Sequence, residues 1–589
     1  MAEIEPIDKH LDALLSRLAT KPSPELSAAV RLLSSFGRQG HVCIALADVG
    51  KAELEEIGLA NVGNPKSWSK ALRESGVVGT VDEHKPLVLD HAGRLYLQRY
   101  WEYEKRVADE LIRRSRSEEI KFYKQKLNST LANFFAQNAE MQKLAAFVAA
   151  TRKLCVISGA PGTGKTRTVV LACALMIALS DEPLTFALAA PTGKAAARLK
   201  ETVAQCRAEL DLPPEIAAQI PGEASTIQRL LGARGNSIRF QHNAERPLNA
   251  DVVVVDEASM VDLALLAKLL TAVRPDARLL LIGDKDQLAS VEAGSVFRDI
   301  CSPGTETGVS QELARKFAAA TGVKLSGAMP RQAPLQDCIV ELRKNYRFRD
   351  NDAIAQLSRA VNAGDVETAL AVVERGEAVT LRSLPKMLER ELRAKVLPHF
   401  QRLAGLRDPV AALREQGNFA VLCAVRRGPT GAETINRLLA EMLRGSERER
   451  YFHGLPLMIV RNDYQSGLFN GDLGIVLADD EGKSRAYFPG EADRARAFAL
   501  GRLPEHESAF ALTVHKSQGS EFRRALMILP ERDTPVLTRE LLYTGVTRVR
   551  EGLEIWARRD VFAQALRRKV QRASGLADAL WNEAKGKKG

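Results

Sequence analysis

The sequence predicts an α/β protein that contains two doubly wound, parallel-sheet domains. Between about residues 135 and 330, short apolar runs such as LCVIS and DVVVVDE alternate with helical stretches. Runs that are apolar at consecutive positions suit strands buried on both faces of a parallel sheet. The same alternation resumes after residue 340, in FAVLCAVR, RALMILP and LEIWA. Each part is therefore expected to form one such domain.

The chain has 589 residues, which is too long for one hydrophobic core. A helix-rich region precedes the alternating part. Within the second half, three β-like runs separated by Gly and Asp, with a turn at Asn470 and Gly471, predict a small inserted β-barrel domain. The expected boundaries are 1–120 for a helical N-terminal domain, 121–335 for the first α/β domain, 336–439 and 506–575 for the second, 440–505 for the insert and 576–589 for a basic tail.

Charge and hydropathy narrow the class of protein. Lys and Arg number 84 against 73 Asp and Glu, a net charge of +11. This excess suits a nucleic-acid partner, and a basic solvated surface explains it equally well. The longest apolar run, 169–179, is shorter than the roughly 20 residues that cross a bilayer. With no membrane span and no targeting signal at the N-terminus, the expected compartment is the cytoplasm.

The cysteines predict neither a metal site nor a disulfide framework. None belongs to a C-x-x-C pair, and most stand in apolar surroundings, as reduced core residues do. They are Cys43, Cys155, Cys173, Cys206, Cys301, Cys338 and Cys423.

A glycine-rich loop follows the apolar run LCVIS. The sequence GAPGTGKT at 159–166 matches G-x-x-x-x-G-K-[ST] and precedes the helical stretch TVVLACALMIAL. Glycines let successive backbone N–H groups point at phosphate oxygens, and the helix N-terminus adds its positive dipole end. Lys165 would bridge the β- and γ-phosphates, and Thr166 would offer its hydroxyl to Mg²⁺. The alternative is a glycine-rich turn with an exposed lysine. The residues expected to bind nucleotide are Gly159, Ala160, Pro161, Gly162, Thr163, Gly164, Lys165, Thr166 and Arg167.

Two acidic residues follow the four valines at 252–255. The strand would deliver Asp256 and Glu257 to its carboxyl end, where ligands bind in open α/β sheets. Asp256 would hold Mg²⁺ opposite Thr166, and Glu257 would orient and deprotonate the attacking water. Two acids that begin a helix are the alternative. After the next run, RLLLIG, Gln287 could sense the γ-phosphate through a hydrogen bond.

Two arginines are candidates for stabilising the phosphoryl transition state. They are Arg347 in NYRF and Arg548 in LLYTGVTRVR. A guanidinium is always charged and planar, so it suits the charge that develops on the γ-phosphate oxygens. Both are assigned to the second α/β domain, so nucleotide would lie in the cleft and draw the domains together. For either arginine, a surface ion pair is the alternative.

Seven stretches, taken in order, resemble the helicase motifs of superfamily 1. They are SGAPGTGKT, APTGKAAARL, VVVVDEASMVD, LIGDKDQLASVEAGSVF, LRKNYRF, TVHKSQGSEF and LLYTGVTRVR. The resemblance is closest to the RecD family and implies two RecA-like P-loop motor domains with ATP and Mg²⁺ as cofactors. It also implies a 5′-to-3′ DNA helicase subunit of the RecBCD complex, exodeoxyribonuclease V. Such a subunit unwinds duplex DNA ends for double-strand break repair by homologous recombination, and its partners are RecB, RecC and single-stranded DNA.

The same resemblance implies roles for further residues. Gln142 would read adenine, and Tyr346 would stack near the base. Gln518, Gly519 and Glu521 would couple the DNA strand to the nucleotide. The expected contacts to the DNA backbone are Pro191, Thr192, Gly193, Lys194 and Thr226 from the first motor domain, and Thr513, His515, Lys516 and Ser517 from the second.

Three different functions also fit these motifs. A stand-alone RecD-like helicase would carry helix-hairpin-helix units in a longer N-terminal region, and the roughly 130 residues before Gln142 are short for them. We therefore favour the complex-bound subunit, with its N-terminal domain on RecC. The second is an RNA helicase of the same superfamily, and the third is a scaffold switched by nucleotide. Because no further carboxylate-and-lysine cluster stands out in the sequence, nuclease activity is expected in a partner subunit.

Overall fold

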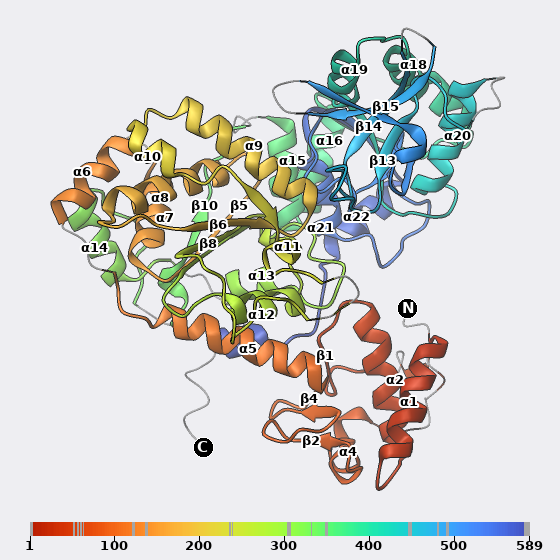
Figure 1. Cartoon of the computed structure of the whole chain (residues 1–589). Coiled ribbons are helices and arrows are strands. Elements are labelled where there is room, and N and C mark those ends of the chain that lie inside the picture. Colours follow the sequence, from red (N-terminus) through yellow and green to blue (C-terminus); the bar gives the residue numbers. More distant parts are fainter. Residues whose placement is uncertain are drawn as a thin grey trace.

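The computed structural model describes the chain from residue 4 to residue 581 apart from short gaps. The described residues are 4–50, 54–55, 58, 62, 64–120, 124–135, 139–234, 237, 239–302, 308–330, 333–347, 352–445, 450–479, 482–490 and 494–581. Figure 1 shows two parallel-sheet domains side by side, with the N-terminal domain, in red, below them. Of the helices in these residues, none has the length and apolar character needed to cross a membrane.

Among the described residues, six strands form the parallel sheet of the first domain, in the order β10-β5-β9-β8-β6-β7. The strands are β5 (Leu154–Gly159), β6 (Phe186–Ala190), β7 (Ala224–Thr226), β8 (Val252–Val255), β9 (Arg278–Gly283) and β10 (Ile339–Leu342). The helices are α6 (Lys124–Phe134), α7 (Glu140–Thr151), α8 (Lys165–Leu179), α9 (Gly193–Glu209), α10 (Pro214–Gln219), α11 (Ile227–Leu230), α12 (Leu263–Ala272), α13 (Val296–Cys301) and α14 (Gln311–Thr321). Every residue of β5 and β8 is buried, as their apolar runs predicted.

The predicted boundary between the two α/β domains, at 335–336, is wrong. Strand β10 lies beyond it and pairs in parallel with β5, from Ile339 opposite Val156 to Leu342 opposite Gly159. Only alternate residues of β10 are buried, because it is an edge strand. Glu341 therefore interrupts its apolar run, which removes the signal that marked the inner strands.

Five strands of the described chain form the parallel sheet of the second domain, in the order β11-β20-β19-β12-β18. The strands are β11 (Val379–Arg382), β12 (Phe419–Cys423), β18 (Ala511–Thr513), β19 (Phe522–Ile528) and β20 (Val549–Trp556). The helices are α15 (Ala353–Ala363), α16 (Val366–Arg375), α17 (Leu388–Glu391), α18 (Leu397–Ala404), α19 (Pro409–Gln416), α20 (Ala432–Arg444), α21 (Arg539–Val546) and α22 (Arg559–Arg567). The three apolar runs that predicted this domain are β12, β19 and β20.

The insert is an antiparallel sheet. In the described parts of 450–508, five strands lie in the order β16-β15-β14-β13-β17, which is an open sheet in place of the predicted barrel. The strands are β13 (Pro456–Ile459), β14 (Leu473–Ala478), β15 (Ser484–Pro489), β16 (Ala495–Ala499) and β17 (His506–Ser508). Strand β17 extends the insert beyond the predicted end at 505. The predicted first residues of the insert, 440–444, belong instead to helix α20. Gly471 has the expected positive φ of 93°, but a long loop, 460–472, replaces the tight hairpin between β13 and β14.

The N-terminal domain is mixed, whereas the sequence predicted a helical one. Four short strands of its described part form a sheet in the order β1-β4-β3-β2. They are β1 (Cys43–Ala45), β2 (Val78–Gly79), β3 (Leu87–Leu89) and β4 (Arg94–Leu97), beside the helices α1 (Pro6–Leu18), α2 (Pro24–Arg38), α4 (Ser69–Glu74) and α5 (Gln98–Ser115). Strands of two to four residues leave little alternation to read in a sequence. Helix α5 leads from this domain onto the first α/β domain, where it packs on α12.

The predicted basic tail begins too early. Residues 576–581 form helix α23 (Leu576–Trp581), and Leu576 and Leu580 are fully buried in the hydrophobic cluster of the first α/β domain. The chain reaches this place from the second domain, and Figure 1 shows the blue segment running down to α5. On the way, the Val42 amide donates to the Ala573 carbonyl at 2.9 Å. The polar end of the predicted tail, 582–589, lies outside the described residues.

The cysteines lie in the core of the protein, as their apolar surroundings predicted. All seven lie in the described parts of the chain, and all are buried thiols. Burial raises the pKa of Cys173 and of Cys423 to about 12, so both thiols stay protonated at neutral pH.

Candidate nucleotide and nucleic-acid sites

The glycine-rich loop joins the end of β5 to the start of α8. Gly162 and Gly164 have positive φ angles of 85° and 80°, which the curl of the loop requires. Thr163 Oγ1 donates to the Ala160 carbonyl at 2.8 Å and braces the turn. Lys165 Nζ donates to the carbonyls of Gly159, at 2.7 Å, and Ala160, at 3.2 Å. The lysine is thus held against the loop, where a phosphate can replace these carbonyls as its partner.

The two acidic residues lie where the sequence predicts, directly after β8. Burial, followed by the negative charge of Glu257, raises the pKa of Asp256 to about 6. Among the residues that the structure describes, Glu257 is the one non-glycine residue with a positive φ, 51°. A left-handed backbone at such a residue costs about 1–3 kcal/mol and is typical of functional sites. A cation held by Asp256 would favour its ionised form.

One cleft of about 250 Å³ brings the predicted catalytic residues together. Its lining includes Lys165, Asp256, Glu257, Gln287, Arg347 and Arg548, together with Thr166, Gly519 and Glu521. These residues come from both α/β domains. Gly519 and Glu521 follow β18 of the second sheet, and Arg548 follows α21. Their individual roles remain predictions.

A second cavity, of about 390 Å³, adjoins the loop and contains the predicted adenine contacts. Gln142 Nε2 donates to the Tyr346 hydroxyl at 3.2 Å, and Tyr346 is 55% exposed. Phe134 and Phe135 also line the cavity, and sequence reasoning missed them. The pair FF just before Gln142 is the signal that could have found them. The cavity is mostly apolar and large enough for a nucleobase.

Arg347 belongs to the first domain, which corrects its predicted assignment to the second. It follows β10, and the segment 345–347 packs on the glycine-rich loop. The Tyr346 amide donates to the Gly162 carbonyl at 2.8 Å, and Asn345 Nδ2 donates to the Pro161 carbonyl at 2.9 Å. A Cβ atom on Gly162 would lie 2.6 Å from the Cβ of Arg347. Of the two arginines, only Arg548 therefore reaches the cleft from the second domain as predicted.

Glu521 is an ion-pair centre at the junction of the domains. Its carboxylate pairs with Arg347 at 2.5 Å, with Arg550 at 2.5 Å, and with Arg198 of α9. Burial alone would raise the pKa of the Glu521 carboxyl, but Arg198 and Arg347 lower it far below its usual value. Arg198 also lines the nucleotide cleft. Sequence reasoning missed Arg198, because its partner is more than 300 residues away in the chain.

The segment after β9 connects the cleft to the second domain. Gln287 Nε2 and the Tyr543 hydroxyl both donate to Asp284 Oδ2, each at 3.0 Å. Burial raises the pKa of Asp284 to about 6. The Leu288 carbonyl accepts from Gln518 Nε2 at 3.1 Å. Gln287 is thus part of a chain of contacts between the domains, as a γ-phosphate sensor would need to be.

Two of the predicted DNA contacts of the first domain, Gly193 and Lys194, lie against the insert. Lys194 Nζ donates to Ser520 Oγ at 2.5 Å and to the Gly471 carbonyl at 3.0 Å. The ring of Phe469 covers Gly193 so closely that a Cβ there would lie 2.3 Å from it. The other predicted contacts are at helix starts, where the Thr192 and Thr226 hydroxyls accept from the amides of Ala195 and Arg229. Pro191 lies between β6 and α9.

The predicted DNA contacts of the second domain follow β18. Thr513 Oγ1 accepts from the Lys516 amide at 3.2 Å, and Lys516 Nζ pairs with Glu507 at 2.7 Å. Burial and the charge of Arg572 lower the pKa of His515. Ser517 is fully buried and donates to the Val514 carbonyl at 2.7 Å. Its hydroxyl is thus bonded within the turn after β18, and its contact with DNA stays a prediction.

The fold and the cleft define a P-loop nucleoside triphosphatase with two parallel-sheet domains. Three family models match parts of the chain. They are the RecBCD enzyme subunit RecD N-terminal domain at residues 2–96, an AAA domain at 142–293 and a UvrD-like helicase C-terminal domain at 508–555.

Curated relatives match the chain over most of its length. The RecBCD enzyme subunit RecD of Mycolicibacterium smegmatis is 36% identical, over 98% of this chain and 97% of that protein. The corresponding subunit of Haemophilus influenzae is 33% identical, over 89% and 86%. The ATP-dependent RecD2 DNA helicase of Deinococcus radiodurans is 30% identical, over 68% of this chain and 46% of its own length. The chain belongs to the RecD family, and it carries the domains of an ATP-dependent DNA helicase.

Proposed function

We propose that the chain is the RecD subunit of a RecBCD-type complex, in which it unwinds duplex DNA ends by moving 5′ to 3′ on single-stranded DNA. The observation that carries the proposal is the cleft between the two α/β domains. It combines the glycine-rich loop and acids of the first domain with Gly519, Glu521 and Arg548 of the second. A ligand that binds both sets of residues draws the domains together, and loss of its terminal phosphate releases them. This cycle is the stroke of a translocase.

ATP hydrolysis is assigned to residues of this cleft. Lys165 binds the β- and γ-phosphates, and Glu257 orients the attacking water and takes its proton. Thr166 and Asp256 would hold Mg²⁺, which supplies a positive charge to the phosphate oxygens. A hydroxyl and a carboxylate on one cleft suit this ion. Arg548 stabilises the charge that develops on the γ-phosphate.

Arg347 is also assigned to stabilise the charge on the γ-phosphate, but it must first leave another partner. Because its guanidinium pairs with Glu521, it must exchange this carboxylate for phosphate. The exchange would pass the state of the nucleotide to the loop that carries Lys516, which is the predicted coupling role of Glu521. The base is assigned to the cavity between Gln142 and Tyr346.

Single-stranded DNA is assigned to a track across both domains. On the first domain the track comprises residues 191–194 and Thr226, and on the second Thr513, His515, Lys516 and Ser517. Lys194 would first have to leave Gly471 and Ser520. The partners are assigned as RecB and RecC, with the N-terminal domain on RecC. This assignment is supported by relatives that are subunits of RecBCD and match nearly the whole chain. The nuclease of the complex is assigned to a partner subunit.

DNA-stimulated ATP hydrolysis tests the motor assignment. We expect single-stranded DNA to increase hydrolysis by the full chain, with Lys165→Gln as the inactive control. An equal or larger increase with single-stranded RNA would contradict the DNA assignment. Hydrolysis that no nucleic acid stimulates, alone or with RecB and RecC, would favour a scaffold that uses nucleotide only as a switch.

A further inference from the structure

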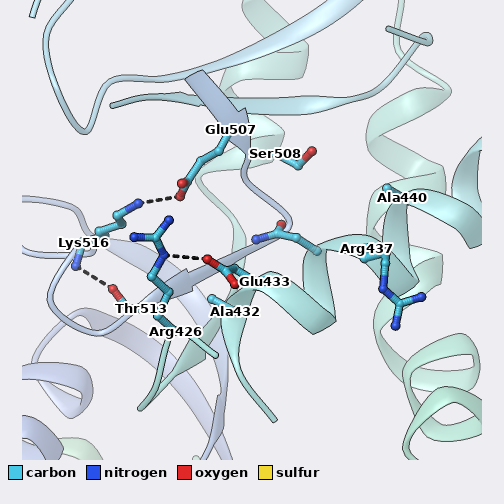
Figure 2. Close-up of a pocket in the computed structure, with 10 residues that line it drawn as sticks. Arg426, Ala432, Glu433, Arg437, Ala440, Glu507, Ser508, Thr513 and Lys516 are labelled. Atoms are coloured by element: carbon cyan, nitrogen blue, oxygen red, sulfur yellow. Dashed lines mark hydrogen bonds and ion pairs between the residues drawn. The ribbon is translucent and has the colours of Figure 1, made fainter. Parts of the chain in front are cut away.

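A cavity outside the nucleotide cleft carries an inference about the regulation of nucleic-acid binding. It has a volume of about 280 Å³ and lies where the insert meets the second α/β domain. Figure 2 shows three cationic side chains around it, Arg426, Arg437 and Lys516, together with Glu433 and Glu507. Lys516 is one of the predicted DNA contacts, and the two arginines line the same cavity.

Each of these cations is paired with a carboxylate. Lys516 Nζ lies 2.7 Å from Glu507 Oε1, and Arg426 Nε lies 2.7 Å from Glu433 Oε1 (Figure 2). Arg437 pairs with Glu441 at 3.2 Å, one turn further along α20. Two of the three carboxylates, Glu433 and Glu441, stand on the same helix of the second domain. Glu507 differs, because it comes from the insert.

The second-domain side of the cavity is held firmly. Asn436 of α20 accepts from the Ala511 amide at 3.0 Å and donates to the Ala511 carbonyl at 2.8 Å, which fixes the helix to β18. The Lys516 amide bonds to Thr513 Oγ1, so the loop keeps its shape whatever the ammonium contacts. Glu507 instead belongs to β17, which pairs with β13 at Met458 in the sheet of the insert. The Glu507 side chain is 35% exposed, so its carboxylate can leave Lys516 by a change of its own rotamer.

We propose that Glu507 occupies the place of a backbone phosphate at Lys516, so that this carboxylate gates the binding of single-stranded nucleic acid to the second domain. A carboxylate and a phosphodiester both offer anionic oxygens to an ammonium, and they compete for it. The inference rests on the proposed function, since it takes the Lys516 loop as part of the nucleic-acid track. Binding requires the Lys516 ammonium to exchange Glu507 for phosphate.

The strength of the ion pair suits a gate. The side chains of Lys516 and Glu507 are 31% and 35% exposed, so solvent screens their attraction. Such pairs change an equilibrium by a small factor, which a phosphate can overcome together with the counterions that it releases. The gate therefore weakens binding without closing the site.

The test is the affinity of the full chain for a fluorescent oligo(dT), measured by anisotropy without nucleotide. We expect Glu507→Gln to bind about two- to fivefold more tightly than wild type, the range that a screened ion pair supplies. Glu551→Gln is the matched control, because it removes the same charge from an ion pair, with Arg523 at 2.5 Å, of which neither member lines the cavity. We expect this variant to bind like wild type.

A second background isolates the pair. We expect Lys516→Gln to bind oligo(dT) more weakly than wild type. Adding Glu507→Gln to this variant should not tighten binding, because Glu507 then has no Lys516 ammonium for which to compete with phosphate. An equal gain in this background, or an equal gain in Glu551→Gln, would overturn the gate and leave a general charge effect. Binding by wild type with no gain in Glu507→Gln would also overturn it, while the proposed function stands. Failure of every folded variant and of wild type to bind would contradict the proposed function itself.

Discussion

Replacing Gly162 by alanine tests the contact between the glycine-rich loop and the segment 345–347. Two costs arise. The φ of 85° at this position is strained for alanine by about 1–2 kcal/mol. The new Cβ would also lie 2.6 Å from the Cβ of Arg347 and 2.8 Å from Asn345 Oδ1, an overpacking that costs about 1–3 kcal/mol. Together they amount to about 2–5 kcal/mol, or nucleotide binding weaker by roughly 30- to 5,000-fold.

Two further glycines separate these costs. Gly164 has a φ of 80° but its nearest non-neighbouring atom is 3.9 Å from an added Cβ, so Gly164→Ala adds strain without overpacking. We expect it to weaken binding by about 5- to 30-fold. Gly501 has neither feature, since nothing lies within 4 Å of its added Cβ, and Gly501→Ala should bind like wild type.

The assay is titration of the full chain with a fluorescent ATP analogue, with thermal unfolding as a check on the fold. The expected order of affinity is wild type and Gly501→Ala, then Gly164→Ala, then Gly162→Ala. Equal affinities for Gly162→Ala and Gly164→Ala would show that Arg347 and Asn345 yield at no cost. Wild-type affinity in Gly162→Ala would refute the reasoning altogether.

Three further predictions concern pH dependence, the C-terminal segment and the insert. Burial raises the pKa of Asp284 from 3.8 to about 6, so the folded state favours the protonated carboxyl. Asp284 therefore stabilises the fold fully below pH 4, and this stabilisation of up to about 3 kcal/mol is lost as the pH rises through 6. Chemical unfolding should show Asp284→Asn gaining stability over wild type across this range, and a constant difference would contradict it. Gly575→Ala should lower the thermal midpoint, since its Cβ would lie 2.5 Å from the Tyr96 hydroxyl; an unchanged midpoint would show that the C-terminal segment yields there. Phe469→Ala should increase protease cleavage within 460–472, because the ring that packs on Gly193 is lost, and unchanged cleavage would mean that other contacts hold the loop.

The sequence predicts those elements of the fold whose pattern lies within a few consecutive residues. The inner strands β5, β8 and β9 are apolar at consecutive positions, which makes them visible in the sequence. An edge strand such as β10 has a half-exposed pattern, so the sequence places it in the wrong domain. The strands of the N-terminal domain are too short to show a period.

The same distinction applies to the sites. The glycine-rich loop and the acids after β8 are local patterns, and the structure gathers them in one cleft. The partner of Arg198 lies on another domain, so no local pattern marks the pair. Ser517 fits its motif by sequence, yet only the structure shows that its hydroxyl bonds to the Val514 carbonyl within the turn after β18. Helix α23 has two buried leucines in six residues, too few to distinguish it from a tail by sequence.

Strand displacement on duplexes that carry either a 5′ or a 3′ single-stranded tail tests the 5′-to-3′ helicase assignment most directly. The full chain is assayed with ATP, alone and with RecB and RecC, and Lys165→Gln serves as the inactive control. We predict unwinding from the 5′ tail that the control abolishes in the chain alone. In the presence of RecB and RecC, Lys165→Gln should abolish unwinding of the 5′-tailed duplex and leave unwinding of the 3′-tailed duplex unchanged. The helicase assignment would be contradicted if Lys165→Gln reduced unwinding only on the 3′-tailed duplex, or if it reduced unwinding on neither duplex.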